Sequence, residues 1–375
     1  MITALAFSTI EAIDRAAWNG CFPDELENWD YYRAVEQSAI ADFQWRYLAL
    51  FEEDRLIAAA VAFTTIYSLD TTLQGLGKRI AGRLRRWCPG LLAIRLYALG
   101  SPVAEQCHVG TAGHIAPSRR PALLARLLQL ARRDADQAGI GLLAVKDASH
   151  RDRQWLQACH DAGLQCMPGL PSGELPITFG SVDAYLGLLG KSTRKDLRRT
   201  LRGPSPRIEW RYTVDDQLPR MMQLYEATLA RSELTFERLP ADYFRQVLAH
   251  LDRRAACVLY WLGEELVAFN LVLLDEQRLV DKFFAHDLSN TRQHNLYVRS
   301  WLANVGYCIE HGLAIYACGQ AGYASKLRLG CSFSGNSVFF RHRNRMLDSL
   351  LRLAKMFVRP DRSDPAMAAA IDAQQ

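Results

Sequence analysis

The chain has 375 residues, enough for two domains of ordinary size at about 100–200 residues each. Hydrophobic residues make up 49% and charged residues 23%, a globular composition that excludes an intrinsically disordered chain. The 45 Lys and Arg against 40 Asp and Glu give a net charge of +5, which is too mild to indicate a nucleic-acid binder by itself, and DNA is not an expected partner.

The nine cysteines are scattered, without a Cys-x-x-Cys pair or a His/Cys cluster at zinc-ligand spacing. This pattern indicates a reducing compartment, and we expect neither a metal site nor a permanently bound cofactor. The N-terminal segment does not read as a signal peptide, because Glu11, Asp14 and Arg15 interrupt its apolar residues. No segment reaches the ~20 apolar residues of a membrane helix, so we expect a soluble, cytoplasmic protein of the bacterial type.

The first third of the chain predicts a helix, a hairpin, a strand, a helix and a strand. An aromatic-rich connection with Trp29, Tyr31 and Tyr32 follows the first helix. The hairpin covers residues 43–69, because β-branched and aromatic runs flank a short polar turn at Glu52-Glu53-Asp54. The other elements are a helix near 8–17, a strand at 91–99, a helix at about 119–138 and a strand at 140–146.

The second half repeats that order. Runs at 255–262 and 266–274 predict a hairpin, and a helix over 296–312 carries its apolar residues at 3–4-residue spacing. Gly312 ends this helix as a C-cap glycine would. The remaining elements are strands at 278–285, 313–318 and 337–342, a short helix near 322–328 and an amphipathic helix at 345–358.

The repeated order predicts two copies of one mixed α/β unit, of the α+β mixed-sheet kind. We place the first domain at residues 1–180 and the second at 181–358. The terminal residues 359–375 mix Pro, Asp and Ala and predict a flexible tail.

Hairpin, strand, polar loop, helix and strand is the order of a GNAT acyltransferase domain, and two in tandem resemble the FemAB-like branch of that superfamily. Three stretches carry the resemblance: 163–202, 263–285 and 318–333. The first contains the pattern Ser192, Arg194, Leu197, Arg198 and Arg199. The chain is thereby similar to peptidoglycan-bridge-like and exopolysaccharide-associated GNAT proteins over most of residues 40–345.

The resemblance implies an N-acyltransferase that moves an acyl group from acyl-CoA or an acyl-carrier thioester to an amine of a small metabolite, a sugar or an envelope precursor. It places the active groove in the second domain and leaves the first structural or substrate-binding. Members that use acyl-CoA usually carry a glycine-rich pyrophosphate loop, and the corresponding segment 286–295 has no glycine, while 101–121 has only Gly110 and Gly113.

Two alternatives therefore stay open. The first is an aminoacyl-tRNA-dependent aminoacyltransferase, which the missing loop and a basic helix favour. The second is a non-catalytic module that binds an envelope polysaccharide or lipid.

Acyl transfer to an amine needs a group that takes the amine's proton and donors for the developing oxyanion. Strand alternation predicts Asp281 and Phe283 on one face and Lys282 and Phe284 on the other. An acid within an apolar strand is unusual, so Asp281 is the first candidate base, and a buried partner of an arginine is the alternative. His286 is the second candidate because its ordinary pKa of ~6.5 suits proton transfer, although it can equally be a turn residue.

The segment 318–333 supplies the third catalytic candidate and three substrate-binding ones. The resemblance implies that Lys326 holds a substrate phosphate or carboxylate; an ordinary solvated lysine is the alternative. Gln320 and Tyr323 follow a strand, where neutral donors reach a groove, and Tyr323 serves equally well as a packed aromatic. Arg328 is a further substrate-binding candidate.

Two basic helices complete the analysis. In 191–202, Arg194 and Arg198 are candidate contacts to a phosphate-rich ligand such as tRNA or coenzyme A, the alternative being a solvated helix between domains. Residues 73–87 combine an apolar stripe with Lys and Arg, which indicates a helix on an anionic membrane surface at the inner membrane or, alternatively, one packed on its own sheet.

We expect no thiol nucleophile in the sequence pair Cys107-His108, because neighbours in sequence rarely meet as nucleophile and base. Cys318 reads as a small buried hydrophobic residue.

Overall fold

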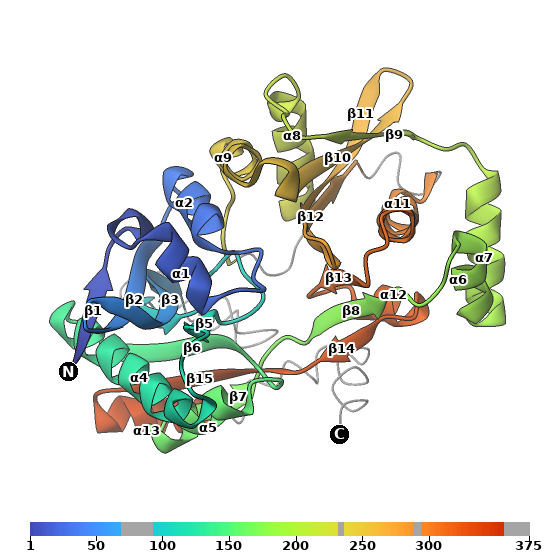
Figure 1. The fold of residues 1–375 in the computed structure, drawn as a ribbon. Helices are drawn as coiled ribbons and strands as arrows, with labels where there is room; N and C mark the ends of the chain where they lie inside the picture. The colour runs from blue at the N-terminus through green and yellow to red at the C-terminus, as the bar shows by residue number, and fades with distance from the viewer. Residues whose placement is uncertain (69–92, 232–235, 288–293, 356–375) are drawn as a thin grey trace, which may run out of the picture. The chain divides into compact units, whose positions relative to one another are not determined.

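The computed structural model describes residues 1–68, 93–231, 236–287 and 294–355. The chain divides into two compact units, each with its own mixed β-sheet (Figure 1). Of the described residues, the first unit contains those in 1–36, 40–170 and 335–355, and the second contains those in 37–39 and 171–334. In the described part of the chain, no helix is long and apolar enough to cross a membrane.

The sheet of the first unit has the order β1-β2-β3-β4-β6-β15-β7, with β5 beside β3. The predicted hairpin is confirmed as β2 and β3, and its turn is tight because Glu53 and Asp54 both adopt positive φ, at 49° and 63°. The strands are β1 (Ile2–Phe7), β2 (Gln44–Glu52), β3 (Arg55–Ser68), β4 (Ala93–Leu99), β5 (Val109–Thr111), β6 (Leu142–Ser149), β7 (Gln165–Pro168) and β15 (Asn336–His342).

Helices cover both faces of this sheet. α4 (Arg120–Gln137) and α5 (Arg153–Asp161) bury Leu124, Leu127 and Trp155 in one core cluster. α1 (Arg15–Cys21) and α2 (Trp29–Gln37) supply Trp18 and Tyr32, whose rings contact Tyr47 of β2. The last helix of the unit, α13 (Arg345–Ala354), follows β15.

Two predictions for the N-terminal segment were wrong. The helix expected near 8–17 is a 3₁₀ turn, η1 (Ile10–Ala12), followed by α1, because Asp14 caps a new helix by accepting a hydrogen bond from the Ala17 N–H at 2.8 Å. The aromatic connection at Trp29 is α2, whose tyrosines are buried against the sheet.

Gly110 of β5 is required by close backbone packing. A Cβ at this position would lie 2.1 Å from the Cys21 carbonyl oxygen and 2.8 Å from the Phe22 ring. We expect Gly110→Ala to lower the free energy of unfolding by about 3 kcal/mol, the upper range for overpacking, because a backbone atom has to move. Urea unfolding measures this change. The control is Gly113→Ala, where a Cβ meets nothing within 4 Å; equal stabilities of the two variants would contradict the prediction.

The sheet of the second unit has the order β14-β8-β13-β12-β11-β10-β9. The predicted hairpin is confirmed as β10 and β11, the predicted long helix is α11, and Gly312 just beyond it has φ +68°. The strands are β8 (Ser172–Pro176), β9 (Arg207–Arg211), β10 (Ala255–Leu262), β11 (Glu265–Leu274), β12 (Arg278–His286), β13 (Ile315–Gly319) and β14 (Ser332–Ser334).

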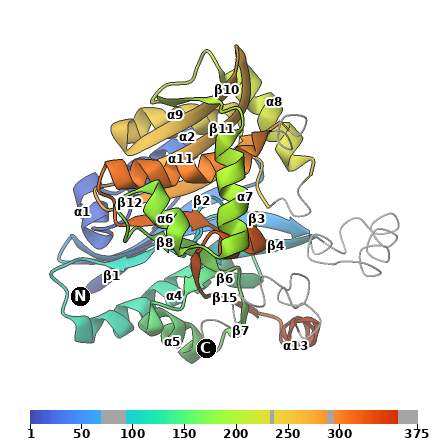
Figure 2. The same cartoon turned by 90° about the vertical axis from the view of Figure 1, so that its right-hand side faces the viewer.

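Helices pack on both faces of the second sheet. α6 (Val182–Leu188), α7 (Lys191–Arg202) and α11 (Leu296–Glu310) lie on one face (Figure 2). α8 (Leu218–Leu229) and α9 (Ala241–Leu251) lie on the other, where Tyr225 and Phe244 contact Phe283 of β12. A short helix, α12 (Tyr323–Arg328), follows β13.

The units differ from the predicted domains 1–180 and 181–358 in two places. β8 already belongs to the second sheet, because it pairs with β13 and β14. The strand predicted at 337–342 exists as β15, but it pairs with β6 and β7 of the first sheet, and its Phe339 is buried in that unit's core. The predicted basic helix at 73–87 and the tail at 359–375 lie outside the described residues.

Candidate functional site

The strands β12 and β13 run in parallel and then separate. Their registered pairs join Arg278–Val280 to Ile315–Ala317. Beyond this point β12 continues to His286 against β11, and β13 continues beside β8. Asp281 is therefore the first residue of β12 after its last registered pair with β13.

A β-bulge in β12 decides which way Asp281 points. Leu271 of β11 pairs with Phe283 and the next residue, Val272, pairs with Asp281, so Lys282 is the extra residue. A bulge interrupts the alternation of side chains along a strand. The predicted alternation, with Asp281 and Phe283 on one face, was therefore wrong.

Ring contacts confirm the reversal. Phe283 packs toward α8 and α9, whereas Phe284 lies 6.1 Å from the Tyr297 ring of α11. The carboxylate of Asp281 also faces the α11 side, where it meets Asn304. The bulge thus places the acid beneath α11.

Neutral hydrogen-bond donors surround the Asp281 carboxylate. Asn270 Nδ2 donates to Oδ1 at 2.6 Å, and the Tyr316 hydroxyl donates to Oδ2 at 2.9 Å. Asn304 Nδ2 lies 3.4 Å from Oδ2 and also donates to Asn270 Oδ1 at 2.9 Å. These partners are neutral amides and a hydroxyl, so the structure does not support the alternative in which Asp281 pairs with an arginine.

Burial raises the pKa of Asp281 above its ordinary value of 3.8. The hydrogen bonds from Tyr316 and Asn270 and the positive charge of Lys326 act in the opposite direction and only partly offset this effect. A carboxylate with a raised pKa is a stronger base than an exposed one, which is the property that a proton acceptor needs.

This shift predicts the pH dependence of any reaction that uses Asp281 as a base. Below its pKa the carboxyl group is protonated and inactive, so kcat/KM should rise with pH through a pKa above 3.8. Because the folded state keeps this proton longer than the unfolded chain, the Asp281 contribution to stability falls as pH rises through the same range. A pH–rate profile that is flat between about pH 4 and 7 would contradict this assignment.

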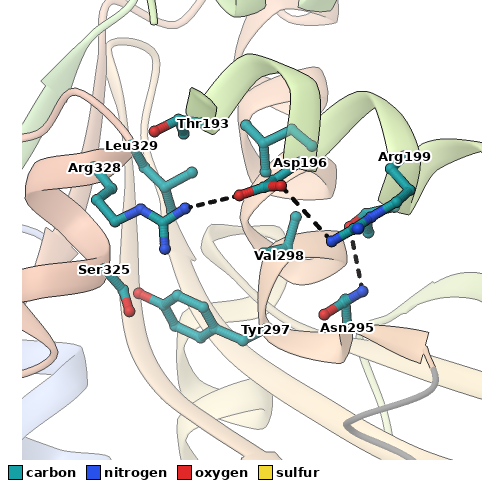
Figure 3. Close-up of a pocket in the computed structure, with 11 residues that line it drawn as sticks. Thr193, Asp196, Arg199, Asn295, Tyr297, Val298, Ser325, Arg328 and Leu329 are labelled. Atoms are coloured by element: carbon teal, nitrogen blue, oxygen red, sulfur yellow. Dashed lines mark hydrogen bonds and ion pairs between the residues drawn. The ribbon is translucent and has the colours of Figure 1, made fainter. Parts of the chain in front are cut away.

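A pocket of about 230 Å³ lies under α7 in the second unit (Figure 3). It is built from one face of α7, the first turn of α11 and the end of α12. Its lining residues are Thr193, Asp196, Leu197, Arg199, Thr200, Asn295, Tyr297, Val298, Ser325, Arg328 and Leu329.

Arginines from two helices line this pocket. Asp196 lies 3.3 Å from Arg328 Nη2 and 3.6 Å from Arg199 Nη2, so one acid orients both (Figure 3). Asn295 Nδ2 donates to Thr200 Oγ1 at 3.2 Å and ties the start of α11 to α7. The N-terminus of α11 adds the partial positive charge of a helix dipole. These groups favour an anionic ligand such as a phosphate.

Tyr297 connects the pocket to Asp281. Its hydroxyl oxygen is buried and has no hydrogen-bond partner among the described residues. Burial, followed by the negative charge of Asp281, raises the pKa of Tyr297, so the phenol stays protonated and can donate to a ligand.

Lys326 is a buried lysine, 6% exposed, so the solvated alternative was wrong. Its Nζ donates to the carbonyl oxygens of Gly319 at 2.8 Å and Gln320 at 2.9 Å, which fixes the turn after β13. Tyr323 is buried, and its hydroxyl donates to the Pro171 carbonyl at 3.2 Å. Tyr323 is thus the packed aromatic of the alternative, and Lys326 positions the loop.

His286 ends β12 and is separate from the hydrogen-bond group of Asp281. Its Nδ1 lies 3.4 Å from the Asp287 carbonyl oxygen, and its ring lies 5.4 Å from that of Phe284. Burial lowers the pKa of His286, so its imidazole is neutral near pH 7. The structure does not bring the two predicted bases into contact.

The basic residues that line the pocket differ in part from the basic residues named as candidates from the sequence. Arg328, one of the predicted substrate-binding candidates, lines the pocket. Arg194 instead donates to the Gly187 carbonyl at 3.1 Å, and Arg198 is exposed and absent from the pocket lining. Arg199 and Tyr297 were missed. Leu197 is the buried residue of α7 and marks the face of the helix that packs inward. Its position in the sequence could have indicated which basic residues of α7 lie near that face.

Burial raises the pKa of Cys107 to about 12 and that of Cys318 well above its ordinary value. Neither thiol is therefore a thiolate near neutral pH.

One group of described residues combines ligand types that metals use, and it belongs to the first unit. His108 Nε2 lies 3.3 Å from Glu27 and 3.5 Å from Glu25, and its Nδ1 lies 2.6 Å from the Tyr32 hydroxyl. These contacts attach the connection between α1 and α2 to the start of β5. They form a cluster of a histidine and two carboxylates within the fold.

Comparisons with known proteins agree with this geometry. The family described as the acetyltransferase (GNAT) domain matches residues 191–326, which include Asp281 and all the pocket-lining residues except Arg328 and Leu329. No curated protein matches the chain.

Three solved structures have a similar fold. FemX is 13% identical, with a TM-score of 0.59, and covers 93% of this chain and 99% of its own. L-PGS from Bacillus licheniformis is 12% identical, with a TM-score of 0.51, and the match covers 88% of this chain and 95% of L-PGS. The C-terminal domain of a putative lysylphosphatidylglycerol synthetase from Agrobacterium fabrum is 14% identical, with a TM-score of 0.50. The match covers 90% of this chain and 95% of that domain. Residues 191–326 thus match the acetyltransferase (GNAT) domain, and the chain is similar in fold to FemX and L-PGS over most of its length.

Proposed function

We propose that the second unit transfers an acyl group from a phosphate-containing thioester, acyl-CoA or an acyl-carrier protein, to an amine of a small metabolite, a sugar or an envelope precursor. The observation that carries this proposal is that Tyr297 lines a pocket with two arginines and is close enough to Asp281, at the point where β12 and β13 separate, for the charge of that acid to raise its pKa. The first unit is structural or binds the acceptor. We place the reaction in the cytoplasm.

The residues of this site supply each proton movement that the transfer requires. The amine nitrogen attacks the thioester carbonyl carbon, so a C–N bond forms and the C–S bond breaks. Asp281 accepts the proton that the amine loses, and its raised pKa suits that role. The Tyr297 hydroxyl, which remains protonated, donates a hydrogen bond to the departing thiolate, and the thiolate takes up the proton that Asp281 accepted from the amine.

The pocket supplies donor binding. Arg199 and Arg328, held by Asp196, provide charge-assisted hydrogen bonds to phosphate oxygens. The first turn of α11 adds backbone N–H groups that point toward an anion. This arrangement supports a phosphate-bearing donor although residues 286–295 contain no glycine.

A second candidate is an aminoacyl-tRNA donor, in which the bond that breaks is a C–O ester bond. The observation that favours it is the outer surface of α7, where Lys191, Lys195, Arg198 and Arg202 are exposed. Such a basic helix tracks a nucleic-acid backbone. The fold similarity to FemX agrees with this candidate but leaves the donor open.

The experiment adds acetyl-CoA, a long-chain acyl-CoA, an acylated acyl-carrier protein and a pool of aminoacyl-tRNA separately and measures the melting temperature. A ligand bound only by the folded chain at about 1,000 times its Kd stabilises it by about 4 kcal/mol. A shift with a CoA thioester, and amide product when amines are added, supports the proposal. A shift with tRNA alone supports the second candidate. If neither CoA thioesters, nor an acyl-carrier protein, nor tRNA shifts the melting temperature, both transferase candidates are overturned. The hypothesis of a non-catalytic binding module then remains.

A further inference from the structure

Helix α13 of the first unit turns its apolar side chains outward. Met346 is 78% exposed, Leu347 45%, Leu350 59% and Leu353 57%. Their spacing places them along one face of the helix. Isolated exposed apolar residues are ordinary on a protein surface, but a contiguous stripe on one helix indicates a binding surface.

The inward contacts of α13 are polar. Asp348 accepts hydrogen bonds from the His342 N–H at 2.8 Å and from Gln165 Nε2 at 3.0 Å. Just after the helix, Lys355 Nζ donates to the Cys166 carbonyl at 3.3 Å. A surface helix normally buries its apolar face and exposes its polar one. Here the arrangement is reversed, so the described residues of the unit do not cover this apolar face.

The charges around the stripe identify what it contacts. Residues 343–355 contain four Lys or Arg and one acid, Asp348, which points inward. Arg343 and Arg345 are exposed at the start of the helix, and Arg352 is exposed on its polar side, 3.8 Å from Asp348. An apolar helix face bordered by cations fits the boundary between headgroups and acyl chains of an anionic bilayer. A two-fold contact with a second copy would instead bring the same arginines together.

We propose that α13 attaches the protein to the surface of an anionic lipid bilayer. Met346, Leu347, Leu350 and Leu353 enter the interfacial region, and the exposed arginines contact lipid phosphates. The helix has 10 residues, so it lies on the membrane and does not span it. The inference does not depend on the identity of the acyl donor.

The test is co-sedimentation of the full chain with lipid vesicles. We expect binding to phosphatidylcholine vesicles that contain about 30% phosphatidylglycerol, no binding to phosphatidylcholine alone, and release in about 0.5 M NaCl. Leu350→Asp should lower the bound fraction at least about tenfold, because a charge enters the interfacial face. The matched control is Leu188→Asp on α6, an equally exposed leucine at 71%, which should bind like the unmodified chain.

Each other outcome overturns the proposal. If the unmodified chain does not bind anionic vesicles, α13 is not a lipid-binding surface. The same follows if the Leu350→Asp variant binds these vesicles as strongly as the unmodified chain. If sedimentation velocity shows a dimer that Leu350→Asp converts to a monomer, the face belongs to a second copy. Because Leu350 is exposed, the variant should keep the melting temperature of the unmodified chain, which separates lost binding from lost folding.

Discussion

Asp281→Asn should lower kcat by about 10²–10⁴-fold, the usual contribution of a positioned proton acceptor, with the fold retained. Asn has nearly the same shape as Asp but cannot accept the amine's proton. The expected loss is in kcat with a small change in donor KM, because Asp281 does not line the arginine pocket. Steady-state kinetics with the donor found by thermal shift measures both quantities.

The matched control for this variant is Asp183→Asn, an exposed acid in the first turn of α6. It should keep the activity of the unmodified chain. Circular dichroism and the melting temperature show whether Asp281→Asn is folded. A folded Asp281→Asn with more than about half of the original kcat would show that Asp281 is a structural acid and not the base.

The double variant Arg199→Ala, Arg328→Ala should raise the donor KM by about 10–100-fold with little change in kcat. Each arginine offers a charge-assisted hydrogen bond worth about 1.5–3 kcal/mol, and the effects of the two overlap because Asp196 orients both. The measurement is the donor KM, with calorimetric Kd as an independent value.

The control is the double variant Arg194→Ala, Arg198→Ala on α7. It also removes two positive charges, but from residues that do not line the pocket. With a CoA thioester it should leave KM nearly unchanged. If the control raises KM as strongly as the pocket variant, the general charge of α7 binds the donor and the pocket does not. With tRNA as donor, that same result is expected, so the pair of variants also separates the two candidates.

The order of elements in each unit was predictable from sequence because local patterns determine it. β-branched runs around polar turns gave β2–β3 and β10–β11, and the spacing of apolar residues gave α4 and α11. The partner of β15 was not predictable. Its sequence shows an apolar strand but does not specify which sheet it joins, since that depends on contacts between residues about 190 apart, such as Phe339 with Val145.

The candidate site was predicted in part. Asp281 was identified as an unusual acid in an apolar strand, and the structure places it among neutral donors beneath α11. The face it occupies was not predictable, because strand alternation assumes a regular strand and the extra residue Lys282 breaks it. Arg199 and Tyr297 were missed because their role depends on how α7, α11 and α12 pack together.

The central claim is that the donor binds in the second unit, in the pocket next to Asp281. Hydrogen–deuterium exchange with and without a saturating acyl donor tests it most directly. We predict slower exchange of the amides at 193–200, 295–298 and 325–329, which line the pocket. Protection confined to the first unit, for example around His108, would contradict the claim and place donor binding there instead.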